Sequence, residues 1–163
     1  MFDSFHRQMD AAPNDEAVVV ELMTFGGDAD VGRRLALEIR MAQKHLGRTF
    51  YFVGKTVVYS AGITIMAAFP QANRCLTSDT ILLIHDRRTE RQVNLSGPLS
   101  AGIIIARAAL SQLEIGMQLE QEGFAELIAG SDITQHEINR LAATNWYFTA
   151  DEALNRKLVA SLL

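Results

Sequence analysis

The amino-acid sequence predicts a single α/β domain in which crossover helices cover a parallel β-sheet. Along the first half of the chain, short apolar runs rich in β-branched residues alternate with segments whose apolar side chains recur at helical spacing. Glycine-containing turns follow several of these runs, which is the strand, turn and helix pattern of parallel sheets. The 163 residues have the length of one ordinary domain and contain no linker or repeat, so residues 1–163 are expected to form one unit.

The first half of the chain predicts four strands and three helices. Valines dominate the first strand, and an apolar stripe of Val31, Leu35 and Ile39 defines the longest of the helices. In chain order we expect a helix over 2–10, a turn at Pro13-Asn14-Asp15, a strand over 17–23, a helix from Asp28 or Asp30 to Leu46, strands over 49–53 (stopped by Gly54) and 57–59, a helix over 63–69 and a strand over 81–84.

The second half predicts mainly helices. Residues 98–128 form one long expected helix, with Leu110, Leu113 and Met117 near a 3.5-residue rhythm. This stripe fits either a projecting helix that contacts a partner or a stripe packed inside the same chain. Thr134 and Thr149 each precede a glutamate by three residues, the capping-box pattern that begins a helix, and an extended aromatic piece is expected between the two helices.

Composition and charge restrict the function classes. The net charge of -4 argues against a nucleic-acid partner, because phosphate binding needs a concentrated basic face, and acidic residues interrupt the small cluster of Arg87, Arg88 and Arg91. No stretch reaches the ~18 unbroken apolar residues of a membrane span, so no membrane contact is expected. The first residues lack the pattern of a signal peptide, so a cytoplasmic location is expected.

Cysteine and histidine usage predicts neither a disulfide nor a metal site. Cys75 is the single cysteine and cannot pair within the chain, so it is expected to be a structural thiol. The four histidines have no spacing typical of metal ligands, and neither a metal nor a cofactor is expected. They are His6, His45, His85 and His136.

Three strand ends carry the groups that acyl transfer needs. Ser60 lies between a β-rich run and an apolar helix, and His85 directly follows the strand over 81–84. Since the carboxyl ends of parallel strands meet at one edge of a sheet, a serine nucleophile and a histidine general base are expected there together. The N–H groups of Gly27 and Ala61 are the expected oxyanion donors, because glycine leaves its N–H unobstructed and a helix N-terminus leaves its first N–H groups free.

Three motifs are similar to those of one known family. They are Thr24-Phe25-Gly26-Gly27 after a buried strand, Tyr59-Ser60-Ala61-Gly62 before an apolar helix, and Leu83-Ile84-His85, with 25 residues from the serine to the histidine. They resemble the proteolytic subunit of the Clp protease, a member of the ClpP/crotonase superfamily, and the ending from Trp146 to Val159 is similar as well. The resemblance is weakest over 87–130, and the family's first N-terminal strand has no counterpart here.

This resemblance implies a ClpP/crotonase-like spiral of parallel strands with crossover helices and a projecting helix at about 98–128 for oligomer contacts. It further implies a serine-type endopeptidase that hydrolyses peptide bonds in unfolded polypeptides through Ser60 and His85. The implied partners are peptide or protein substrates, further copies of the chain in a ring, and an ATP-dependent unfoldase.

One departure concerns the family's third catalytic residue, an aspartate. The ungapped alignment places Leu141 there, and leucine can neither orient an imidazole nor stabilise its charged form. Asn145 is the expected substitute as a neutral orienting acceptor, and Asn139 and Asp132 are further candidates. Without such a residue, the site works poorly as a dyad or does not work.

Other functions stay open beside the peptidase. A catalytically weak or inactive ClpP-like subunit would act as a structural or assembly partner, and Leu141 is the motive for this alternative. A crotonase-type acyl-CoA enzyme would share the fold and the oxyanion hole, although no glutamate pair is placed for that chemistry. A Ser-Lys dyad would need Lys55, which nothing assigns as a base.

Overall fold

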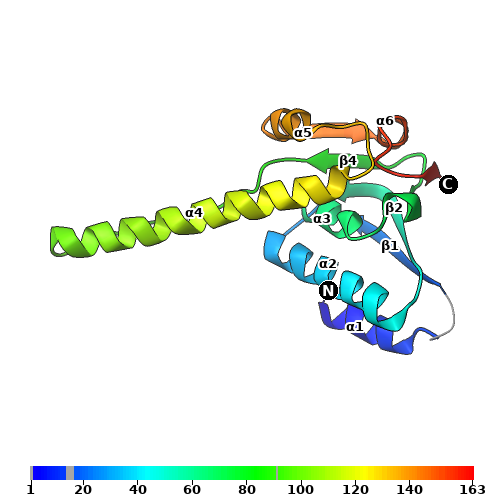
Figure 1. Cartoon of the computed structure of the whole chain (residues 1–163), viewed down its shortest axis with the longest axis horizontal. Coiled ribbons are helices and arrows are strands. Elements are labelled where there is room, and N and C mark those ends of the chain that lie inside the picture. The colour runs from blue at the N-terminus through cyan, green and yellow to red at the C-terminus, as the bar shows by residue number, and fades with distance from the viewer. Residues whose placement is uncertain (1, 14–16, 91) are drawn as a thin grey trace.

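The computed structural model describes residues 2–13, 17–90 and 92–163, and in these ranges six strands form one curled mixed sheet (Figure 1). The strands run in the order β5-β4-β2-β3-β6, and β1 pairs with β2. Their bounds are Val18–Thr24 (β1), Phe50–Tyr59 (β2), Arg74–Leu76 (β3), Ile81–Ile84 (β4), Trp146–Thr149 (β5) and Ser161–Leu162 (β6).

The long strand β2 organises the sheet. Its first half pairs with β3 and its second half with β4, while β1 follows the opposite edge. Because two strands leave one edge of β2 at different heights, the sheet curls instead of staying flat. The mixed α/β class is therefore confirmed, with parallel pairing for β1–β2, β2–β3, β2–β4 and β3–β6.

The expectation of a wholly parallel sheet is wrong for β5, which pairs antiparallel with β4. A parallel neighbour is reached through a single crossover, whereas two helices separate β4 from β5 and return the chain in the opposite direction. The extended aromatic piece at 146–148 was predicted, but its direction was not.

The expectation of two strands over 49–53 and 57–59 is also wrong, because β2 is continuous from Phe50 to Tyr59. An irregularity does occur in it: Thr56 has φ 57°, and the β1–β2 register shifts at this height. Gly54 does not end the strand. A Cβ there would lie 2.6 Å from Leu76 Cδ2 and 2.9 Å from Val58 Cγ2, so a larger residue would clash with these neighbouring side chains.

The predicted helices form with small changes of boundary. The helix expected over 63–69 begins earlier and ends earlier, and the expected turn falls partly on Asn14 and Asp15, which lie outside the described residues. The helix bounds are Phe2–Ala11 (α1), Ala29–Leu46 (α2), Ala61–Ala67 (α3), Leu99–Ile128 (α4), Gln135–Ala142 (α5) and Ala150–Asn155 (α6), with a short 3₁₀ turn at Gln71–Asn73.

The predicted helix starts are confirmed by their caps. Asp28 Oδ1 accepts the N–H groups of Asp30 and Val31 at the start of α2. The hydroxyls of Thr134 and Thr149 each accept the N–H three residues on, at the starts of α5 and α6.

A buried arginine connects three segments of the core: the chain after α3, the end of α4 and the chain after α6. Arg74 is 2% exposed, and its guanidinium donates to the carbonyls of Phe69 and Leu127, both at 2.8 Å, and of Leu158 at 3.3 Å. Burial lowers the pKa of Arg74 to about 10, which still leaves it charged at neutral pH. Arg74 thus fixes the C-terminal ends of α3 and α4 against the last segment of the chain.

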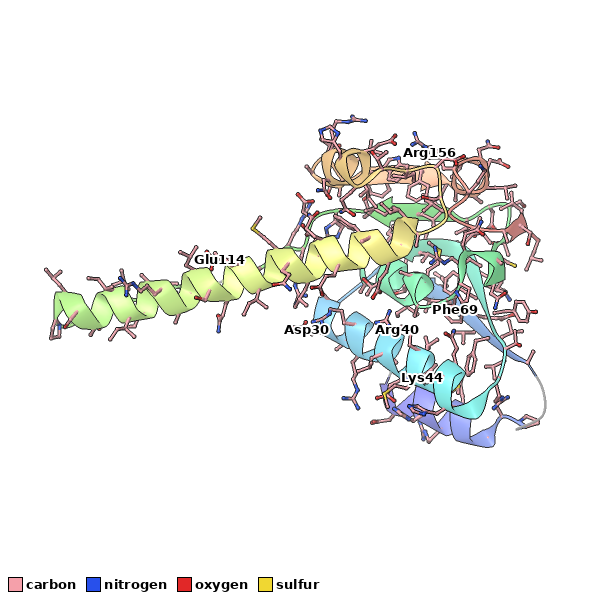
Figure 2. All side chains as sticks on the ribbon, in the orientation of Figure 1. Asp30, Arg40, Lys44, Phe69, Glu114 and Arg156 are labelled. Atoms are coloured by element: carbon pink, nitrogen blue, oxygen red, sulfur yellow. The ribbon has the colours of Figure 1, made fainter. Side chains whose placement is uncertain are left out.

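The helix α4 projects from the body of the molecule, and Glu114 lies well along its free part (Figures 1 and 2). Phe124 and Leu127, near its end, are its buried residues. The apolar stripe of Leu110, Leu113 and Met117 is exposed, so it does not pack inside this chain. By length and composition alone α4 could also cross a membrane, and its most apolar window is not buried inside this structure.

Candidate active site

The structure brings Ser60 and His85 to neighbouring strand ends. Tyr59 faces Leu83 in the parallel β2–β4 pair, and the Ser60 N–H donates to the Leu83 carbonyl at 2.9 Å. His85 follows β4 directly, so the two side chains leave the sheet at the same edge. Both line one cavity of about 460 Å³, together with Gly27.

Ser60 occupies a sharp turn between β2 and α3. Its backbone has φ 54° and ψ −112°, a combination that non-glycine residues rarely adopt and that costs about 1–3 kcal/mol. Such a turn between a strand and a helix is the way in which many hydrolases expose a nucleophilic hydroxyl. Ser60 is partly buried, and within the described residues its hydroxyl makes no hydrogen bond.

The glycine pair after β1 lies against this turn. A Cβ on Gly26 would lie 2.9 Å from Ser60 Cβ, and Gly26 has φ 99°, so only glycine fits. Gly27 follows and lines the cavity. In the described part of the chain, the N–H groups of Gly27 and Ala61 have no hydrogen-bond partner. Two backbone donors are thus unused beside Ser60, as an oxyanion hole requires.

The structure explains why the residues after Ser60, Ala61 and Gly62, are small. They serve the packing of α3. A Cβ on Gly62 would lie 2.5 Å from Thr24 Cγ2, and Ala61 lies against Gly32 of α2. Close contact with β1 and α2 therefore places the start of α3, and with it Ser60.

A backbone carbonyl orients the His85 imidazole. His85 Nδ1 lies 2.6 Å from the Asp86 carbonyl oxygen. A carbonyl can only accept a hydrogen bond, so Nδ1 carries the proton and Nε2 is left as the basic nitrogen. No hydrogen bond joins His85 to Ser60 among the described residues, as is common in ligand-free sites whose contacts tighten on binding substrate.

The candidates for the missing aspartate are engaged elsewhere. Leu141 packs against the core. Asn145 comes next to His85 in register, because Ile84 faces Trp146, yet its Oδ1 accepts from Arg88 Nη2 at 2.7 Å. The other two form bonds of their own: Asn139 with Gln121 and Gln135, and Asp132 with Lys157.

A carboxylate that sequence reasoning missed reaches the segment after β4. Glu120 of α4 lines the cavity with Ser60 and His85, and its Oε2 accepts the backbone N–H of Arg87. Burial raises the pKa of Glu120, and the charge of Asp86 adds to this, while Arg87 and His85 oppose it. In the sequence, Glu120 is one of several acidic residues on a long helix, and no pattern distinguishes it.

An ion pair of Arg87 also holds this segment. The Arg87 guanidinium lies 2.7 Å from Asp30 Oδ1 of α2 and, through this hydrogen bond, lowers the pKa of that carboxyl. Lys55, by contrast, pairs with Glu21 at 2.7 Å and does not line the cavity. Within the described residues, no group of three or more metal-ligating side chains occurs.

No protein-family model matches this chain, and a comparison with curated proteins found no significant match.

Proposed function

We propose that this protein is a ClpP-like serine endopeptidase that hydrolyses peptide bonds in unfolded polypeptides. One observation supports the proposal above all: a serine on a strained strand-to-helix turn faces the same cavity as a histidine from the neighbouring strand, beside two unused backbone N–H groups. Serine, imidazole and paired donors are the three components of acyl transfer by a serine hydrolase.

The proposed reaction assigns a step to each group. His85 Nε2 takes the proton from Ser60 Oγ as this oxygen attacks the peptide carbonyl, and the N–H groups of Gly27 and Ala61 bind the resulting oxyanion. The peptide C–N bond breaks, and the imidazolium gives its proton to the leaving amine. Water, deprotonated by His85, then hydrolyses the serine ester and releases the second product.

The fold supports a ClpP/crotonase-like spiral. In this proposal the pairing of β3 and β4 with two halves of β2 is the first turn of the spiral. The exposed stripe on α4 is proposed as the contact between copies in a ring. An ATP-dependent unfoldase as a partner follows from the resemblance and is proposed with it, and a cytoplasmic location is proposed as well.

A catalytically weak or inactive subunit is the second candidate function. The observation that favours it is the carbonyl of Asp86 at His85 Nδ1, where a serine peptidase of this family would have a carboxylate. A neutral acceptor orients the ring but stabilises the imidazolium less well, which reduces turnover.

A fluorophosphonate probe tests the two candidates. We expect wild-type protein to be labelled at Ser60, as located by peptide mass mapping, and to hydrolyse an unfolded substrate, because Nε2 is free to act as the base. Ser60→Ala and His85→Ala should abolish both, while Ser78→Ala, at an exposed serine of the β3–β4 turn, should change neither. A well-folded wild-type sample without labelling between about pH 6 and 9 would favour the inactive subunit.

A further inference from the structure

The Asp86 carbonyl at His85 Nδ1 does not supply the negative charge that an aspartate would place beside the histidine. It fixes the tautomer, but it carries only a partial charge, so it compensates little of the positive charge that His85 gains in the reaction. A full negative charge near the ring would supply that compensation, even from a group that does not touch the ring.

We propose that Glu120 is the positioning residue of this site: it holds the segment that follows His85 against α4 and supplies the negative charge that favours the imidazolium. This inference depends on the proposed function, since it concerns the same serine and histidine.

The contacts of Glu120 support its positioning role. Its carboxylate accepts the Arg87 N–H, two residues beyond His85, and the side chain of Arg87 bonds to Asp30 on α2 at 2.7 Å. The segment after β4 is thus held between α2 and α4. Arg88 adds a third contact, a hydrogen bond to Asn145, which directly precedes β5. A histidine carried by a segment with three such contacts keeps its place at the cavity.

The other carboxylates around the cavity have different partners. Asp28 caps α2, and Asp30 pairs with Arg87 and Arg33. Glu126 pairs with Arg40 at 2.7 Å, and Glu122 accepts a hydrogen bond from Gln118. Among the described residues that line the cavity, Glu120 is the carboxylate that bonds to the backbone of the His85 segment.

The electrostatics of Glu120 agree with a charge effect on His85. The groups that face it from the segment after β4 are Asp86, Arg87 and His85, and the last two favour its ionised form. A Coulomb interaction acts on both charges, so a carboxylate at this place is the charge that the proposed imidazolium would meet. Partial burial strengthens this coupling because less water screens it.

Two substitutions separate the charge of Glu120 from its hydrogen bond. Glu120→Gln keeps an oxygen that can accept the Arg87 N–H but removes the charge, whereas Glu120→Ala removes both. We expect Glu120→Gln to lower kcat for peptide hydrolysis by about 10- to 100-fold with little change in KM, and Glu120→Ala to lower it further. Glu120→Asp should restore part of the loss. Glu114→Gln, which makes the same charge change on the free part of α4 (Figure 2), should leave both constants unchanged.

An NMR titration tests the contact without any turnover. In the wild type, the His85 ring resonances should show an inflection at the pH where Glu120 ionises, above the ordinary value for glutamate, and Glu120→Gln should abolish it. Glu114→Gln should retain it.

The two experiments distinguish the inference from the proposed function. An active wild type with unchanged kcat in Glu120→Gln, or a His85 titration without the Glu120 inflection, would overturn the inference and leave the peptidase intact. An inert wild type that shows the inflection would overturn the peptidase while supporting the contact between Glu120 and His85.

Discussion

Ser60 shows at the scale of one residue how the fold maintains an unfavourable conformation. Its positive φ costs about 1–3 kcal/mol, which the surrounding contacts must offset. The N–H of Ser60 is bonded to β4, Gly26 leaves it room on one side, and α3 is fixed by its small residues on the other. Strain of this kind is typical of functional sites, where it places a reactive group.

This strain predicts an unusual effect of glycine at position 60. Ser60→Gly should be more stable than Ser60→Ala by about 1 kcal/mol, because glycine adopts this backbone without the steric cost of a Cβ. Urea unfolding of the two variants measures the difference.

The matched control for this prediction is the next residue. Ala61→Gly should destabilise the protein, since Ala61 begins α3 with ordinary helical geometry and glycine is the poorer helix former. A Ser60→Gly variant that is less stable than Ser60→Ala would contradict the interpretation of Ser60 as strained.

At the scale of elements, the sequence predicts the parts that depend on local pattern. The ends of β2 and β4 could be placed because apolar runs stop at Tyr59 and Ile84, and their parallel pairing then brings Ser60 and His85 together. The three-residue β3 and two-residue β6 are too short for any periodicity. Glu120 could not be found because its partner, the Arg87 N–H, is 33 residues away and belongs to a loop.

The elements α5, β5 and α6 are held together by Arg156 (Figure 2). Its guanidinium lies 2.6 Å from Glu137 Oε1 of α5 and 3.3 Å from Glu152 Oε1 of α6, and its carbon is 5.3 Å from the centre of the Trp146 ring. The hydrogen bond from Arg156 lowers the pKa of Glu137. One cation thus connects three elements at the β5 edge of the sheet, next to Asn145.

The Glu137 shift predicts a pH dependence with a definite sign. Since the folded pKa of Glu137 is lower than the unfolded one, its stabilisation is fully present above the unfolded pKa and is lost as the pH falls through the folded pKa. Wild type should therefore be more stable than Glu137→Gln at pH 7, and this modest advantage should be smaller at about pH 3, where protonation of Glu137 competes with the ion pair. Urea unfolding monitored by the single tryptophan, Trp146, measures it at both pH values.

The control for the Glu137 pair is the variant without its cation. In an Arg156→Gln background, the effect of Glu137→Gln should depend much less on pH, because the largest cause of the shift is removed and only the smaller effects of Arg140 and Thr134 remain. A pH-dependent difference that persists undiminished in this background would show that another group is responsible.

At the scale of the whole molecule, α4 connects the surface to the site. Its free part exposes Leu110, Leu113 and Met117 on one stripe, while Glu120 lines the cavity and bonds to the segment after His85. Apolar area of this extent on a projecting helix is costly in water and is covered when another surface packs on it. A second copy of the same helix offers a matching apolar stripe.

Assembly through this stripe predicts the effect of polar substitutions. The triple variant Leu110→Gln, Leu113→Gln and Met117→Gln should shift the protein from an oligomer toward the 18.0 kDa monomer, as measured by light scattering on a sizing column. Gln112→Ala, on the opposite side of the same helix, should leave the mass unchanged. A wild type that is already monomeric at micromolar concentration would contradict the prediction.

Because assembly would also brace the helix that carries Glu120, we expect the monomeric variant to be labelled at Ser60 more slowly than the wild type.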